Sequence, residues 1–277
     1  PSQTRWLLRR CSSASSTHRQ SCPRLAYTGA RFPFLAANVL DRATGQTLFA
    51  PTIVKSIGGV RVGFIGVVTR STPGIVVPSA VAGVRFVDAP IGRILDVLLA
   101  LGLRDNTIVM LLGDCGWKLG EHGGWGKLTN YEIDTRATLL IAAPGLTPAG
   151  KVENRIVELV DLHPSMCEMA GLAPPDKLDG ISFVPLFRDP ARSWKAAAFS
   201  QFPRSFSNRI MGRAMRTERY RYIEWIDWYD DVLIATELYD HQTDPQENVN
   251  IAGDPANAAL LRSLAAQMKA GPKAALP

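Results

Sequence analysis

Apolar residues follow helical and strand-like patterns over the middle of the chain. Directly after Pro90 they recur at helical spacing and predict a helix. Residues 107–112 and 138–143 are continuous apolar runs, which predict strands buried on both faces of a parallel sheet. The amphipathic stretch 155–170 predicts a second helix, with Pro164 near its start or at a kink. This alternation of helix and strand is typical of the α/β class.

Residues 31–88 have a different pattern, because no stretch of helical period occurs in them. β-Branched runs at 52–57 and 60–68 flank Gly58-Gly59, which predicts a β-hairpin. This part of the chain is therefore expected to be rich in strands.

The C-terminal part has shorter elements. From about residue 196, short apolar runs at hairpin-like spacing predict a small antiparallel sheet. Pro255 then opens an amphipathic stretch that predicts a terminal helix ending near Lys269. The predicted regions are a disordered or non-native leader (1–30), a strand-rich fragment (31–88), an α/β part (90–195) and a small C-terminal subdomain (196–277).

Basic charge is concentrated at the N-terminus. Residues 1–31 hold six arginines and no acidic residue, while the rest of the chain carries 25 basic and 25 acidic side chains. Because the remainder is balanced, the charge pattern argues against nucleic-acid binding. The leader matches a transit peptide in composition, although we favour a disordered or non-native segment. No stretch approaches the roughly 18 consecutive apolar residues of a membrane-spanning helix, and the compartment is left open.

Candidate chemistry lies in the glycine-rich segment 113–127, which leaves the carboxyl end of the 107–112 strand. Ligand sites in α/β sheets collect at such strand ends. Asp114 is placed to hold a divalent cation, and Lys127 to contact an anionic substrate oxygen. The alternative is a glycine-rich loop whose Asp caps a helix and whose Lys is solvated, and spacing alone does not separate the two.

A colinear series of motifs runs through residues 90–277. The series comprises Gly92-Arg93 with Asp96, 103–109, 114–132, 158–164, 178–183, 215–222, Leu238-Tyr239-Asp240 and 244–248. In these motifs the chain resembles the C-terminal part of a sulfatase of the alkaline-phosphatase superfamily, closest to the iduronate-2-sulfatase-like group. The resemblance implies an α/β, alkaline-phosphatase-like fold that acts on sulfated carbohydrates or other sulfate esters.

The resemblance also implies roles for three residues of the loop. In the family the loop reads Asp-His-Gly, whose Asp and His complete a calcium site, and a following Lys contacts sulfate. By position, Asp114 is a metal ligand, Cys115 stands at the second ligand position, and Lys127 is the catalytic, sulfate-contacting lysine. Calcium prefers hard oxygen ligands, so a thiol at position 115 is expected to weaken its binding.

Two motifs of that family do not occur in this sequence. One is an Asp-Asp pair at the end of the first strand, and the other is Cys-x-Pro/Ser-x-Arg, whose Cys becomes the formylglycine nucleophile. The segment Cys22-Pro23-Arg24 is a near miss that lacks the intervening residues. We therefore expect an incomplete, inactive sulfatase fragment.

A second set of motifs lies upstream, at 31–38, Thr44-Gly45, 60–69 and 81–86. In them the chain resembles bacterial metallophosphatase-type 5′-nucleotidases, between whose metal-binding motifs this stretch lies. The sequence thus looks like a chimera joined near residues 88–91. Two alternatives stay open: a metallophosphoesterase acting on nucleotides, and a non-catalytic binder of sulfated or phosphorylated sugars through Lys127 and an aromatic face.

Other residues have structural interpretations that we favour. His122 is expected to pack against Trp117 or Trp125 rather than act as a ligand or an acid. The aromatic residues of 220–229 are expected to form one packed face of a strand rather than the floor of a sugar cleft. Cys167 is expected to be a buried thiol. Finally, an unpaired edge of the α/β sheet predicts self-association.

Overall fold

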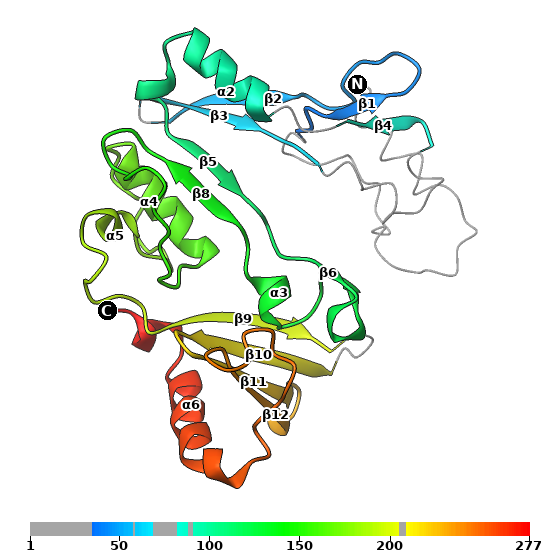
Figure 1. Ribbon diagram of the computed structural model, residues 1–277, viewed down its shortest axis with the longest axis vertical. Helices are drawn as coiled ribbons and strands as arrows, with labels where there is room; N and C mark the ends of the chain where they lie inside the picture. The colour runs from blue at the N-terminus through cyan, green and yellow to red at the C-terminus, as the bar shows by residue number, and fades with distance from the viewer. Residues whose placement is uncertain (1–34, 58, 69–81, 88–90, 205–208) are drawn as a thin grey trace. The chain divides into compact units, whose positions relative to one another are not determined.

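The computed structural model describes residues 35–57, 59–68, 82–87, 91–204 and 209–277 (Figure 1). The chain divides into two compact units, Pro1–Arg104 and Asp105–Pro277. The sequence placed the change of region near 88–91 instead. Helix α2 (Ile91–Ala100) accounts for the difference, because it has no buried residue and its periodicity gives no sign of the unit to which it belongs.

Short antiparallel strand pairs form the first unit. Besides α2, its elements are β1 (Val39–Asp41), β2 (Thr52–Ile57), β3 (Val60–Ile65) and β4 (Val84–Phe86). Strand β1 pairs with β4, and β2 pairs with β3 in an antiparallel register, which confirms the predicted hairpin. The buried Asn38 ties these segments together, since its amide donates to the carbonyls of Val68, after β3, and Val87, after β4.

The second unit contains most of the regular structure, and the 3₁₀ turn η3 (Arg104–Asn106) lies at the division between the units. Its strands are β5 (Val109–Leu112), β6 (Lys118–Leu119), β7 (Trp125–Gly126), β8 (Leu139–Ala142), β9 (Ala197–Pro203), β10 (Ile210–Thr217), β11 (Tyr220–Asp227) and β12 (Val232–Asp240). Its helices are α3 (Glu132–Thr135), α4 (Leu162–Met169), α5 (Val184–Arg188) and α6 (Ala258–Ala270). Its 3₁₀ turns are η4 (Glu121–Gly123), η5 (Leu159–Asp161), η6 (Pro255–Asn257) and η7 (Pro272–Ala275).

Strands β5 and β8 are the two apolar runs of the sequence, and they pair antiparallel rather than parallel as predicted. An apolar run indicates burial but not the direction of the neighbouring strand, so the antiparallel pairing could not be predicted from it. The prediction that these strands are buried on both faces is also wrong. Met110 and Ile141 pack against the core, whereas their neighbours Leu111 and Leu140 are exposed on the other face of the pair.

The helix predicted over 155–170 is shorter than expected. Its α-helical part, α4, starts at Leu162, and Pro164 lies in the first turn, as predicted. Upstream, the buried Lys195 donates to the carboxylates of Glu158 and Asp161 at 2.7 Å. These polar contacts hold the chain before η5 in an extended conformation that periodicity does not reveal. Cys167 is partly buried, so its expected burial is only partly correct.

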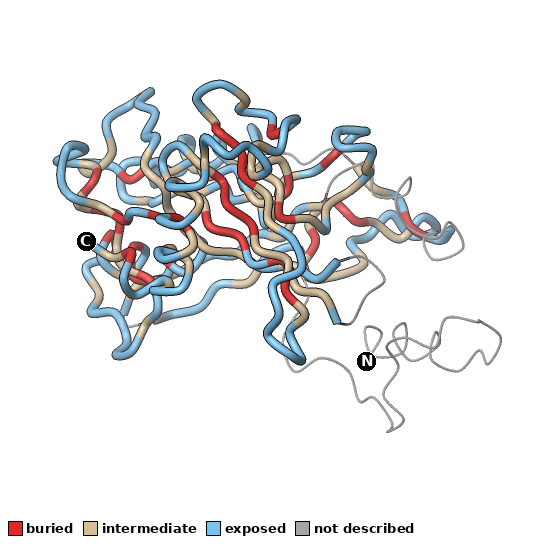
Figure 2. Tube along the Cα trace, turned by 90° about the horizontal axis from the view of Figure 1, so that it is seen from below, coloured by how far each residue is buried: buried red, intermediate tan, exposed pale blue. Residues whose placement is uncertain are grey.

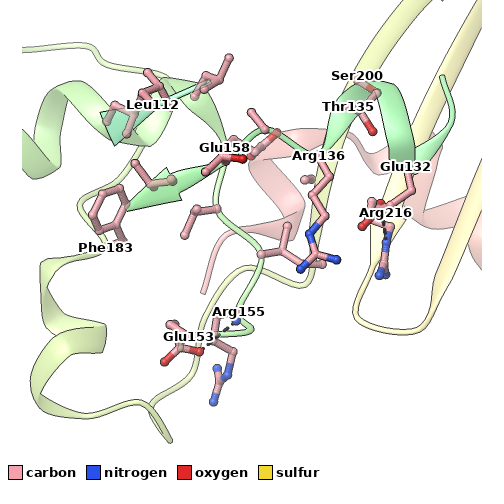
Figure 3. Close-up of a pocket in the computed structure, with 18 of the residues that line it drawn as sticks. Leu112, Glu132, Thr135, Arg136, Glu153, Arg155, Glu158, Phe183, Ser200 and Arg216 are labelled. Atoms are coloured by element: carbon pink, nitrogen blue, oxygen red, sulfur yellow. Dashed lines mark hydrogen bonds and ion pairs between the residues drawn. The ribbon is translucent and has the colours of Figure 1, made fainter. Parts of the chain in front are cut away.

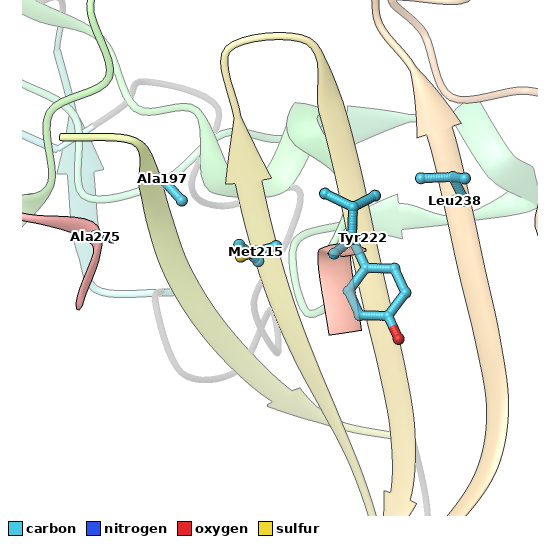
Figure 4. Close-up of a cluster of buried hydrophobic side chains, with 6 residues drawn as sticks. Ala197, Met215, Tyr222, Leu238 and Ala275 are labelled. Carbon is cyan, nitrogen blue, oxygen red and sulfur yellow. The ribbon is translucent and has the colours of Figure 1, made fainter. Parts of the chain in front are cut away.

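The C-terminal sheet and terminal helix confirm the prediction for this region. Four antiparallel strands lie in the order β12-β11-β10-β9, and α6 contributes Leu264 to the core on one face of the sheet (Figure 1). The other buried members of this core come from the sheet and from η7 (Figure 4), namely Ala197, Met215, Tyr222, Leu238 and Ala275. This subdomain therefore has a hydrophobic core of its own.

Buried positions form short, separate stretches along the chain (Figure 2). Among the described residues they group into several small hydrophobic clusters instead of one large core. No helix in the described ranges combines the length and the hydropathy that crossing a bilayer requires.

Candidate functional site

The loop after β5 brings the three predicted site residues together. Lys127 Nζ lies 2.9 Å from Asp114 Oδ2, and the Cys115 thiol donates to Asp114 Oδ1 at 3.4 Å. The short β6–β7 ribbon makes this possible, because it reverses the chain between residues 118 and 126. Asp114 is therefore the acceptor of both a lysine and a thiol, at the carboxyl end of β5.

The backbone beside this group is closely packed. Gly116 donates its N–H to the carbonyl of Asp134 at 2.9 Å, and a Cβ on Gly116 would lie 1.7 Å from the carbonyl oxygen of Ile133. Only glycine fits such an approach. The residue after Cys115 is thus fixed against helix α3, which fixes the start of the loop.

Charge pairing dominates the electrostatics of Asp114 and Lys127. The hydrogen bond from Lys127, and next that from Cys115, holds the pKa of the Asp114 carboxyl below its usual value. The hydrogen bond to Asp114, and next an interaction with the Cys115 side chain, raises the pKa of the Lys127 ammonium. Both groups are therefore charged at neutral pH. The Asp114 side chain is 85% exposed, so water screens the pair and its contribution to folding stability is small.

These residues do not fit a calcium ion by themselves. Calcium takes roughly six to eight oxygen ligands, and Asp114 offers the only carboxylate of the trio. Cys115 supplies a soft sulfur, and Lys127 supplies a positive charge. Among the described residues, the group of three potential metal ligands lies elsewhere, at Glu132, His241 and Glu247.

A buried polar group, which we call the loop clamp, holds the base of the loop. It consists of Lys118, Thr129 and Asp134. Lys118 Nζ pairs with Asp134 Oδ2 and donates to Thr129 Oγ1 at 3.2 Å, while the Thr129 hydroxyl donates to the same carboxylate. Lys118 and Asp134 are almost fully buried. The clamp joins β6 to the chain just beyond Lys127, and its residues have no sequence spacing that would have revealed it.

A second charged group, the α3 charge cluster, joins α3 to the C-terminal sheet. It consists of Glu132, Arg216, Arg221, His241 and Glu247. Arg221 pairs with Glu132 and donates to Glu247 Oε1 at 2.5 Å, and Arg216 Nε lies 3.1 Å from Glu132 Oε2. His241 Nε2 lies 2.7 Å from Glu247 Oε1. The cluster thus spans α3, β10, β11 and the turn after β12.

The potential metal ligands of this cluster already have partners. Glu132, His241 and Glu247 place their ligand atoms within 4.8 Å of one another. However, two guanidinium groups balance the two carboxylates. Burial raises the pKa of Glu132, but the charges of Arg221 and Arg216 outweigh it, so that pKa lies below its usual value. A cation would have to displace an arginine, so we interpret the cluster as a structural connection.

A cleft of about 1330 Å³ lies next to the loop (Figure 3). Its lining includes Asp114, Cys115 and Lys127 together with the exposed cations Arg136 and Lys151. Figure 3 shows Arg136 reaching into the middle of the cleft. The predicted site therefore opens onto a space that is large enough for a sugar, and the exposed charged residues that line it are of both signs.

The other predicted side chains have structural surroundings. His122 stacks on Tyr131 with a 4.0 Å centroid separation, so packing is confirmed, but against a tyrosine rather than Trp117 or Trp125. Tyr222 is buried in the sheet core, as expected for a packed face. By contrast, Trp228 and Tyr229 are exposed in the β11–β12 turn. The near-miss segment Cys22-Pro23-Arg24 and the leader 1–30 lie outside the described residues.

Comparison with protein families gives two overlapping matches, each of which covers more than half of the chain. The sulfatase model matches residues 13–172. The model for the C-terminal region of N-sulphoglucosamine sulphohydrolase matches residues 120–273. The first match includes residues 31–88, for which the sequence suggested a second family, and that second resemblance stays a prediction.

Curated relatives match the chain over part of their length. Iduronate 2-sulfatase of Mus musculus is 29% identical over 247 residues, which cover 66% of this chain and 45% of the relative. N-acetylglucosamine-6-O-sulfatase of Bacteroides thetaiotaomicron is 32% identical over 177 residues, covering 62% of this chain and 31% of the relative. The chain thus spans less than half of the length of these relatives.

Solved structures share the fold of the matched part. One is a complex with the substrate D-glucosamine-2-N,6-O-disulfate, with a TM-score of 0.56 and 31% identity over 65% of this chain and 38% of that one. Another is a phosphonate monoester hydrolase from Silicibacter pomeroyi, with a TM-score of 0.58 and 30% identity over 67% of this chain and 38% of that one.

Proposed function

The chain belongs to the sulfatase family, and from this premise we propose that it forms the C-terminal portion of a hydrolase of sulfate esters. The observation that carries the proposal is the contact between Lys127 Nζ and Asp114 Oδ2 at the carboxyl end of β5. Two residues that the family resemblance assigns to one site lie 13 positions apart in the loop, and they meet at the edge of a cleft.

In this proposal Lys127 binds the sulfate group. An ammonium offers three donors, and Asp114 accepts one of them. The ammonium can therefore donate to a sulfate oxygen while it keeps its contact with Asp114. Arg136 and Lys151 are further cations in the lining of the same cleft, which Glu153 and Glu218 also line, and each can pair with an anionic group of a substrate.

A sulfated carbohydrate is the proposed substrate class. Two similar proteins support it: one is named as acting on N-acetylglucosamine-6-O-sulfate groups, and the other is complexed with D-glucosamine-2-N,6-O-disulfate. Calcium is the cation that the family resemblance implies. Because the residues at Asp114 do not fit it by themselves, no step through a metal ion is derived for this chain.

Turnover by this 277-residue chain alone is not expected. The sequence lacks the Cys-x-Pro/Ser-x-Arg motif, so no residue is assigned as the nucleophile that would attack sulfur. We therefore propose that the chain recognises sulfate esters without cleaving them. Recognition and cleavage are separable, since Lys127 and the cleft do not depend on the missing motif.

The test compares binding with turnover. Calorimetric titration with D-glucosamine-2-N,6-O-disulfate is expected to give saturable heat, and unsulfated glucosamine none. p-Nitrophenyl sulfate, with calcium added, is expected to be hydrolysed no faster than in buffer. Absence of binding contradicts the proposed recognition, and hydrolysis of the sulfate ester contradicts the proposed inactivity.

Non-catalytic binding of phosphorylated sugars is the second candidate function. The cations Lys127, Arg136 and Lys151 favour it, because they would attract phosphate as well as sulfate. The metallophosphoesterase alternative has less support. Among the described residues of the first unit, no group of three potential metal ligands occurs. Release of phosphate from AMP with added divalent metal would support the metallophosphoesterase alternative.

We propose that the chain self-associates through the exposed face of β5 and β8. Leu111 and Leu140 are register partners, and both are exposed on that face. Within the described ranges, β5 has β8 as its strand partner and leaves its other edge unpaired. Exposed apolar residues on an unpaired strand favour pairing with another chain.

A further inference from the structure

Three observations bear on whether calcium binds at Asp114. The first concerns ligand number. Around this carboxylate, no described His, Cys, Asp or Glu joins Asp114 and Cys115 to make a group of three potential ligands. Among the described residues, a calcium ion at this carboxylate would therefore have no second carboxylate close enough to complete a three-residue group, and calcium affinity depends on the number of charged ligands.

The second observation concerns ligand chemistry. Cys115 donates its thiol hydrogen to Asp114 Oδ1 at 3.4 Å, so one oxygen of the only hard ligand is already an acceptor. A thiol sulfur is a poor ligand for calcium, because calcium selects oxygen. The residue next to Asp114 therefore works against calcium instead of completing a site for it.

The third observation concerns charge. Lys127 Nζ lies 2.9 Å from Asp114 Oδ2 and neutralises the carboxylate. The loop clamp of Lys118, Thr129 and Asp134 holds the chain two residues beyond Lys127, so this lysine is kept near Asp114 by a buried group. To bind Asp114, calcium would have to displace the Lys127 ammonium, which the loop clamp keeps near the carboxylate.

We propose that the Lys127 ammonium holds the place of the divalent cation on Asp114, so that a sulfate ester binds at this position without calcium. Lys127 then has two roles: it neutralises the carboxylate and it attracts the anion. The sulfate half of this inference rests on the proposed function, whereas the calcium half does not. Without the Lys127 ammonium, the negative charge of Asp114 would repel a sulfate oxygen at this position.

Calcium titration of the full chain, after treatment with a chelator, tests the first half. By calorimetry we expect no saturable binding tighter than about 1 mM for the unaltered chain. The double variant Lys127→Met/Cys115→Asp removes the internal cation and adds a second carboxylate. It is expected to bind calcium at least about tenfold more tightly than the unaltered chain. Lys269→Met, which removes the same charge from the exposed surface of α6, is expected to bind no calcium.

Two results of this titration would overturn the calcium half. One is submillimolar binding to the unaltered chain that disappears in Asp114→Asn. The other is a double variant that binds calcium no better than the unaltered chain while circular dichroism shows it folded. Either result means that Lys127 does not occupy the cation position.

Titration with D-glucosamine-2-N,6-O-disulfate tests the second half. Its affinity is expected to agree within about twofold with excess EDTA and with millimolar calcium, since a cation that does not bind to the chain has no linkage to the binding of the sugar. Sugar binding that requires calcium overturns the inference while leaving the proposed function intact. No sugar binding under either condition refutes the proposed function and the sulfate half together, and the calcium titration still decides the other half.

Discussion

Lys118 and Asp134 form a buried ion pair at the base of the loop that carries Lys127. They are 16 residues apart in the sequence, and the Thr129 hydroxyl donates to the same carboxylate oxygen. The other oxygen, Asp134 Oδ1, has no hydrogen-bond partner among the described residues. The buried carboxylate thus depends on Lys118 and Thr129 for its polar contacts, and removing Lys118 would leave a buried charge without its partner.

Lys118→Met is predicted to destabilise the second unit strongly. The change leaves the Asp134 carboxylate buried without its cation, which typically costs about 3–5 kcal/mol. Urea-induced unfolding, followed by tryptophan fluorescence, measures the loss. Lys127→Met is the matched control, because its ion pair is exposed and worth at most about 1 kcal/mol. Equal losses in the two variants would contradict the buried role of Lys118.

The α3 charge cluster predicts a dependence of stability on pH. The folded-state pKa of Glu132 lies below the 4.5 of an unpaired glutamate, because Arg221 and Arg216 outweigh the effect of burial. A carboxyl with a depressed folded-state pKa contributes stability that is fully present above its unfolded pKa. That contribution is lost as the pH falls through the folded-state value.

The measurement is the urea midpoint as a function of pH. We expect it to fall between about pH 5 and pH 3 in the unaltered chain, and to fall less in Glu132→Gln. The variant is expected to be less stable near neutral pH, where the ionised carboxylate is paired. If the two midpoints fall in parallel on acidification, Glu132 does not contribute in the way described.

The exposed face of β5 and β8 predicts self-association. Sedimentation velocity is expected to show a concentration-dependent oligomer for the unaltered chain, because Leu111 and Leu140 are exposed together. Leu140→Lys places a charge on that face and is expected to shift the distribution toward monomer. Val249→Lys changes another exposed apolar residue, in the segment after β12, and is expected to leave the distribution of oligomers unchanged. Monomer at every concentration would contradict the prediction.

Several parts of the fold follow from sequence pattern. The β2–β3 hairpin, helix α2, the C-terminal sheet and helix α6 were all predicted, because each combines a clear period with its own turn or start signal. The direction of β5 relative to β8 was not predicted. Each is a continuous apolar run, and such a run has no alternation that would separate an antiparallel pair with one bare face from a buried parallel one.

The sequence named candidate site residues only where residue type and family resemblance agreed, and the roles of these residues stay predictions. Asp114, Cys115 and Lys127 were named from the sequence, and the structure brings them together. The residues that position them were missed. In the sequence, Lys118 is not distinguishable from the other polar residues of the glycine-rich loop. Its partner Asp134 lies outside that loop, beyond Lys127. Neither burial nor this pairing has a signature in the local sequence, since both depend on how the loop folds back.

Binding of D-glucosamine-2-N,6-O-disulfate to the unaltered chain and to Lys127→Met tests the central claim most directly. The account predicts saturable binding to the unaltered chain and at least about tenfold weaker binding to Lys127→Met, because the lost ammonium is the charged donor to sulfate. Lys269→Met, which removes an exposed lysine of α6, is predicted to bind like the unaltered chain. Equal affinity of the unaltered chain and Lys127→Met would contradict the account.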